Sequence, residues 1–270
     1  MRFLALAIGI CAAGPVAAQM FADTRLNLQF GQSDAGPGSV SGLLLSADTW
    51  LDFGRSGLQL GVVSQTSDAL GDAVAVRALV WRDLRGPLRL GLSAAYASDD
   101  GVQGGTASFG LHARARTDWY GIEANLLLPD HIRDTGAFSF QFLGQQRLTR
   151  SLSVETQLYR LSTDLEDPDR YTIALGLTYA ATDALTLFGQ GFQTVSDDYA
   201  IKTNGTRLGL AWRVGAGSRL EAAVDWLRPD AASDRLGLTL GWQLDLGGSP
   251  DLADRFAAPI LQDRLAWGAF

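Results

Sequence analysis

The stretch Arg235–Gly247, R-L-G-L-T-L-G-W-Q-L-D-L-G, decides the fold. Its apolar residues fall at every second position, from Leu236 through Trp242 to Leu246, and small or polar residues fill the positions between them. A period of two residues places all the apolar side chains on one face of a β-strand. The same alternation recurs in about fourteen segments of the chain, with almost no helical pattern between them.

The alternating segments predict an all-β protein built as one domain. A β-strand that crosses a membrane needs only about 10 residues, and the segments have about this length. We therefore expect a transmembrane up-and-down antiparallel β-barrel with about 14 strands, within a range of about 12 to 16. The alternative is a soluble all-β protein that buries its apolar faces between stacked sheets. The predicted strands are residues 22–31, 40–53, 57–65, 73–82, 87–97, 104–116, 119–128, 137–148, 151–162, 170–180, 184–195, 204–214, 218–227 and 235–246.

Residues 1–18 have the features of a secretory signal peptide. Arg2 is followed by the apolar run Phe3–Cys11 and then by small residues that end at Ala18. The run is too short to span a bilayer as a helix, and no later stretch approaches 18 apolar residues, which argues against a helical membrane protein. The only cysteine lies within this segment, so we expect no disulfide in the exported chain.

Aromatic residues near the strand ends share the apolar face of their strands. Tyr and Trp rings concentrate at membrane–water boundaries, where an apolar body and a polar edge are both accommodated. We expect two aromatic girdles around the barrel. Their candidate residues are Tyr96, Tyr120, Phe138, Tyr171, Tyr179, Trp212, Trp226 and Trp242.

The connections between strands alternate in length and charge. One set, which includes residues 32–38 and 98–103, is longer and acidic, and the other, which includes residues 54–56 and 149–151, is tighter and leans basic. Short periplasmic turns and longer external loops are typical of outer-membrane barrels. The acidic rim is either a solvated surface or a site for divalent cations that bridge to lipopolysaccharide phosphates.

Together, these features resemble the porin-like outer-membrane β-barrels of Gram-negative bacteria. In strand count and length the chain is similar to the fourteen-stranded monomeric porins, over about residues 20–247. The resemblance implies a place in the bacterial outer membrane, contact with membrane lipid and lipopolysaccharide, and insertion by the barrel assembly machinery. One departure is that Phe270 is a terminal aromatic residue, as in such barrels, but about twenty residues separate it from the last predicted strand.

The expected organisation is a signal peptide at 1–18, an outer-membrane barrel at 19–248 and a periplasmic tail at 249–270. The tail begins with Ser-Pro-Asp, a favourable helix start, and its apolar residues then follow at helical spacing. We consider three arrangements for it. It packs on the barrel rim as a short amphipathic helix, enters the lumen as a plug, or forms a final strand from residues 261–270.

Polar and small residues occupy the strand face opposite the apolar one, as expected for a wet lumen. Fourteen strands lie between eight, which side chains fill, and sixteen, which leave an aqueous channel. The interior charges either set the field that a passing ion meets or pair across the lumen and brace the wall. The candidate lumen-lining residues are Arg77, His112, Glu123, Gln141, Glu155, Gln157, Arg207 and Glu221.

The sequence thus predicts a porin-like passive channel for small hydrophilic solutes. A closed structural or adhesive barrel, whose acidic outer loops contact an outside partner, is the alternative. No nucleic-acid partner is expected, because the net charge is −7 and no basic patch is interleaved with aromatic residues. We also expect no cofactor, because no phosphate-binding glycine loop or metal-spaced Cys/His cluster occurs.

An outer-membrane hydrolase is the third hypothesis, and it needs a histidine base beside a serine nucleophile. Ser108 lies four residues from His112 on one strand face, about 13 Å away at the strand rise, which is beyond hydrogen-bond reach. His131, with Asp130 and Asp134, faintly resembles the Asp/His groups of omptin proteases, but the spacing differs. We therefore predict no enzyme and no catalytic, cofactor-binding or metal-binding residues.

Overall fold

The computed structural model describes residues 21–34, 39–68, 71–99, 106–129, 138–162, 170–196, 202–230 and 233–246. All fourteen predicted strands are present, with ends within a few residues of the predicted ones. Among the described residues, no helix is long and apolar enough to cross a membrane. The strands are β1 (Phe21–Asp34), β2 (Ser39–Asp52), β3 (Ser56–Ser67), β4 (Gly71–Asp83), β5 (Leu88–Asp99), β6 (Thr106–Arg116), β7 (Tyr120–Pro129), β8 (Phe138–Arg147), β9 (Leu152–Ser162), β10 (Arg170–Ala180), β11 (Leu185–Ser196), β12 (Lys202–Gly215), β13 (Ser218–Pro229) and β14 (Arg235–Leu246).

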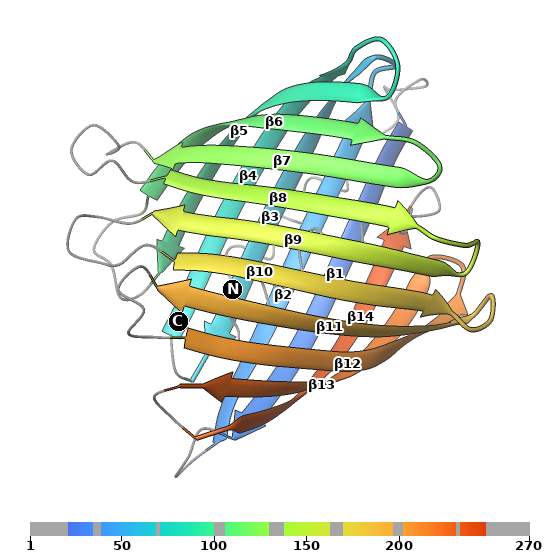
Figure 1. The fold of residues 1–270 in the computed structure, drawn as a ribbon. Coiled ribbons are helices and arrows are strands. Elements are labelled where there is room, and N and C mark those ends of the chain that lie inside the picture. Colours follow the sequence, from blue (N-terminus) through green and yellow to red (C-terminus); the bar gives the residue numbers. More distant parts are fainter. Residues whose placement is uncertain are drawn as a thin grey trace.

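The strands form a single closed antiparallel barrel (Figure 1). Each strand pairs with its neighbours in the chain, and β1 pairs with β14 from Thr24↔Leu246 to Ser33↔Gly237. Closure leaves no strand edge with unpaired backbone groups. The up-and-down barrel fold is confirmed.

The described residues do not include three of the predicted features. These are the signal peptide, the tail at 249–270 with its three arrangements, and His131 with Asp130 and Asp134.

The apolar face of each strand points outward. Leu92, Phe109, Ile173 and Leu208, from four different strands, are each more than half exposed. Monomeric soluble proteins rarely expose contiguous apolar patches larger than a few hundred Å². The apolar faces are not buried between stacked sheets, which rules out the soluble sandwich considered from the sequence.

Short turns gather at one rim of the barrel, on the right in Figure 1, and we call it the short-turn rim. Two local devices build these turns. Glycines adopt positive φ values in three of them, at Gly54, Gly86 and Gly217. In three others a threonine hydroxyl accepts hydrogen bonds from backbone N–H groups two and three residues ahead, at Thr117, Thr149 and Thr182.

The inner face is more aromatic than the sequence pattern indicated. Trp81 lies opposite Gly57 in the register, and Phe188 and Phe192 of β11 lie opposite Gly209 and Gly205 of β12. A Cβ atom on any of these three glycines would collide with the opposite ring. Because the glycines have no side chain, the rings lie flat against the wall.

Candidate functional site: the lumen of the barrel

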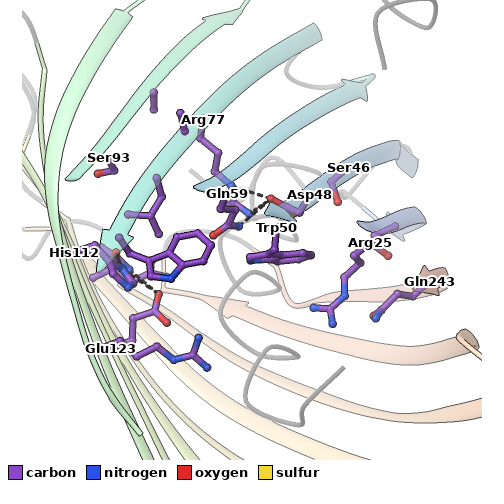
Figure 2. Close-up of a pocket in the computed structure, with 18 of the residues that line it drawn as sticks. Arg25, Ser46, Asp48, Trp50, Gln59, Arg77, Ser93, His112, Glu123 and Gln243 are labelled. Atoms are coloured by element: carbon purple, nitrogen blue, oxygen red, sulfur yellow. Dashed lines mark hydrogen bonds and ion pairs between the residues drawn. The ribbon is translucent and has the colours of Figure 1, made fainter. Parts of the chain in front are cut away.

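The barrel interior contains a cavity of about 280 Å³ lined mainly by polar and charged side chains (Figure 2). Its lining comes from β1 to β8 and from β13 and β14. Five of the eight candidate lumen residues line it, and the other three lie elsewhere on the inner face. Those that line the cavity are Arg77, His112, Glu123, Gln141 and Glu221. Glu155 and Gln157 line a smaller neighbouring pocket, and Arg207 is buried in the wall.

Arg77 of β4 and Asp48 of β2 meet by crossing over β3. The Arg77 guanidinium donates to Asp48 Oδ1 from Nη2 at 2.6 Å and from Nε at 3.2 Å. Gly61 of β3 is the register partner of both residues, and a Cβ there would lie 2.5 Å from Asp48 Oδ1. The glycine therefore makes the pair possible. The Arg77 side chain is 46% exposed and that of Asp48 only 11%, so the positive group projects into the lumen.

His112, Asn125 and Glu123 form a second polar cluster between β6 and β7. Asn125 Oδ1 lies 2.7 Å from His112 Nδ1, and because this oxygen only accepts, the contact requires a proton on Nδ1. Asn125 Nδ2 in turn donates to Glu123 Oε1 at 3.1 Å, and His112 Nδ1 lies 3.8 Å from the same oxygen. Ser108, the serine considered as a nucleophile, lies four residues before His112 on the same face of β6. This cluster orders the wall and has no feature that favours hydrolysis.

Arg207 ties three neighbouring strands together. It is 4% exposed, its Nη2 lies 3.3 Å from Glu221 Oε1, and its Nε lies 3.9 Å from Asp225 Oδ1. Thr239 of β14 donates to Asp225 at 2.8 Å. These charges therefore pair along the wall between β12, β13 and β14.

Sequence reasoning missed several residues of the cavity. The Arg25 guanidinium is 2.7 Å from Asp245 Oδ1 and lies over the Trp50 ring, 5.5 Å from its centroid. The Arg89 guanidinium lies 2.7 Å from Asp83 Oδ1 and 4.6 Å from the Trp81 ring centroid. In each predicted strand, alternation places the arginine on the face opposite the apolar residues. This alternation was the signal in the sequence that could have identified both arginines as lumen residues.

The eight candidate girdle residues divide between the two ends of the barrel. Two of the tryptophans bond to a polar group through the indole N–H: Trp226 Nε1 donates to Asp234 at 3.1 Å, and Trp242 Nε1 donates to Ser218 Oγ at 3.0 Å. The Arg160 guanidinium lies over the rings of Phe138 and Tyr171. Tyr120, Tyr179, Trp212 and Trp242 lie toward the short-turn rim, and Tyr96, Phe138, Tyr171 and Trp226 toward the opposite rim.

In the described part of the chain, no group of three or more His, Asp or Glu side chains is placed to hold a metal ion. Most of the acidic outer connections, such as 100–105 and 163–169, lie outside that part. The divalent-cation hypothesis for the acidic rim therefore stays a prediction.

A closed fourteen-stranded antiparallel barrel with an apolar outer face and a charged, hollow interior has the fold of the porins. No family model matches the sequence, and neither does any curated protein.

Solved porins and channels have the same fold. The anion-selective porin from Comamonas acidovorans aligns with a TM-score of 0.57 and 10% identity over 84% of this chain and 99% of its own. The CymD monoaromatic hydrocarbon channel gives 0.56 and 9% identity over 85% and 89%. OprB of Pseudomonas putida at high pH gives 0.55 and 8% over 84% and 94%. At these identities the similarity establishes the fold and does not identify a solute.

Proposed function

We propose that this protein is a porin-like passive channel of the bacterial outer membrane for small hydrophilic solutes. The observation that carries the proposal is the cavity of about 280 Å³ inside the barrel, where charged side chains remain partly exposed. Arg77, Glu123 and Glu221 project into it, with side chains that are 46%, 24% and 29% exposed. A barrel that served only as a structural element would be expected to fill this space with side chains, as eight-stranded barrels do.

The outer surface supports the membrane part of the proposal. An exposed apolar band runs around the barrel between the two sets of candidate girdle residues. Indole N–H groups at strand ends find polar partners, as expected where the rings meet the headgroup region. In this orientation the short turns are periplasmic and the acidic connections face outward, toward lipopolysaccharide. Membrane insertion would depend on the barrel assembly machinery.

Single-channel recording in a planar bilayer tests the proposal. The full-length protein and a variant without residues 249–270 are compared, and each is first shown to be folded by its heat-dependent mobility in detergent gels. Steady openings of the full-length protein are the expected result. Openings only after truncation would identify the tail as a plug. Silence from both folded proteins would refute the channel and favour the structural or adhesive barrel.

A further inference from the structure

The outer face of the barrel contains a groove of about 720 Å³ that crosses β4 to β8, and we call it the outer groove. Its floor is a continuous row of residues at inward positions of the register, namely Trp81, Gly91, His112 and Asn125. Because a floor residue presents its backbone to the outside, the groove lies on the opposite side of the wall from the lumen. The passage of solutes through the barrel makes no use of it.

Two neighbouring rows of outward side chains bound the outer groove, and the strand register assigns them. The row further from the short-turn rim is bulky and consists of Val80, Leu92, Leu111, Leu126 and Phe140. The row nearer the rim begins with Arg82 and Leu90 and continues with Ala113 and Ala124. Because the two alanine side chains are short, a hollow remains beside the bulky row.

The outer groove descends from the short-turn rim toward the middle of the barrel. Arg82 is the last residue but one of β4 and Ala124 is the fifth residue of β7, although both lie in the same row. Strands are about 4.8 Å apart, so the four steps from β4 to β8 span about 19 Å. At a strand tilt of about 40°, this row falls by about 12 Å, which is about half of the ~25 Å apolar band of a membrane barrel. The groove therefore has the length and slope of a chain that crosses one leaflet.

The end of the outer groove at the rim is positively charged. Arg82 is exposed on the outer face, and Arg55 and Arg85 are exposed in the turns on either side of it. The Asp83 N–H donates to the Arg55 carbonyl oxygen at 2.6 Å, which holds the first of these turns beside Arg82. In the described part of the chain, none of the three arginines has an ion-pair partner.

The nearby carboxylates do not neutralise this end of the groove. Asp52 and Asp83 occupy inward positions of β2 and β4, on the face opposite to Arg82. Asp83 pairs with Arg89 at 2.7 Å. Asp118 is exposed in the next turn along the rim, and β5 and β6 separate it from Arg82. An apolar groove that ends at unpaired guanidinium groups is complementary to an amphiphile with a phosphate headgroup.

We propose that the outer groove binds one phospholipid of the leaflet at the short-turn rim, with an acyl chain between the two rows and the phosphate on Arg82. The proposal rests on the membrane insertion and orientation proposed above, and it does not require conduction. Contacts between the chain and the groove replace contacts between lipid chains, so the apolar part contributes shape and packing without a hydrophobic driving force. The arginines therefore supply most of the preference for this lipid over its neighbours, since a guanidinium binds phosphate through two parallel hydrogen bonds.

Native mass spectrometry of the full-length protein in detergent, titrated with dioleoylphosphatidylglycerol, tests the proposal. The native barrel should bind one molecule, and dioleoylglycerol, which has the same chains without the phosphate, should bind more weakly. Arg82→Gln should weaken binding of the phospholipid about fivefold, the usual effect of one arginine near anionic headgroups. Ala113→Leu, which fills the groove and keeps every charge, should weaken it about threefold through the loss of a few van der Waals contacts.

Two matched controls lie outside the outer groove. Arg150→Gln removes an exposed arginine from the turn between β8 and β9 at the same rim, and Ala222→Leu enlarges an outward alanine of β13 on the opposite wall. Each variant is first shown to be folded by its heat-dependent mobility, and both controls should bind the phospholipid as the native barrel does.

Three results would overturn the lipid site: no binding, equal binding by every variant, or equal binding of dioleoylglycerol. Each would leave the channel to be judged by its conductance. A dimer that Ala113→Leu dissociates would assign the groove to a second copy of the chain and would also overturn the lipid site.

Discussion

Replacing Arg207 with methionine is expected to lower the free energy of unfolding of the barrel by about 3–5 kcal/mol, the usual loss when one partner of a buried ion pair is removed. Methionine retains much of the apolar stem, so the change removes charge and hydrogen bonding more than volume. Arg207 is 4% exposed, and its guanidinium lies within 4 Å of two carboxylates, Glu221 and Asp225.

The two carboxylates should contribute unequally to this loss. The Asp225 side chain is only 11% exposed, and without Arg207 it would keep the hydrogen bond from the Thr239 hydroxyl at 2.8 Å. Glu221 is 29% exposed and keeps part of its hydration. Most of the loss should therefore come from Asp225, which places the expected effect near the lower end of the range, at about 3 kcal/mol.

Urea unfolding in detergent micelles, followed by tryptophan fluorescence, measures the effect. The double variant Arg207→Met with Asp225→Asn should recover at least half of the lost free energy of unfolding, because it also removes the buried charge of Asp225 that has lost its partner. Arg213→Met is the control, since Arg213 lies on the same strand and is exposed, and surface charges usually contribute about 1 kcal/mol or less. A loss below about 1 kcal/mol for Arg207→Met would show that water reaches this site and would refute the wall-bracing role.

Three further predictions concern packing and the outer surface. Gly209→Val should destabilise the barrel by about 1–3 kcal/mol in urea, because its Cβ collides with the Phe188 ring. Leu111→Arg, an outward change at mid-strand, should lower stability in lipid vesicles by about 2–4 kcal/mol, and an unchanged urea midpoint would argue against lipid contact. Single-tryptophan variants that retain only Trp212 or Trp226 should be quenched by lipids brominated near the headgroup; no quenching at either position would contradict the girdles.

The strands were predictable because their signal is local. Alternation of Leu236 to Leu246 with small and polar residues needs no knowledge of the rest of the chain, and burial on one face enforces it. The turns are local as well, since Gly54 and Thr117 form their motifs within three residues. The pairing of β1 with β14 is not a local feature. For an even number of antiparallel strands with apolar outer faces, however, this pairing is the arrangement that leaves no strand edge exposed.

The partners within the lumen could not be predicted. Arg77 and Asp48 are 29 residues apart and meet only because the registers of two hairpins both place Gly61 between them. A shift of one residue in either register would turn one of the two side chains outward. Composition likewise did not reveal that rings such as Phe188 face inward, because only the register shows that a glycine lies opposite each ring.

The position of the inner charges along the lumen lies between these two cases, because strand direction and the alternation of residues assign it without the register. Odd strands begin at the short-turn rim and even strands end there. Arg25, Arg89 and Arg219 come early in odd strands, and Arg114 and Arg213 come late in even ones, so all five must lie toward one mouth. By the same rule Glu123, Glu155 and Glu221 come early in odd strands, so the sequence predicts carboxylates beside these arginines at this mouth, and only the register shows which of them pair, as Glu123 does opposite Arg114.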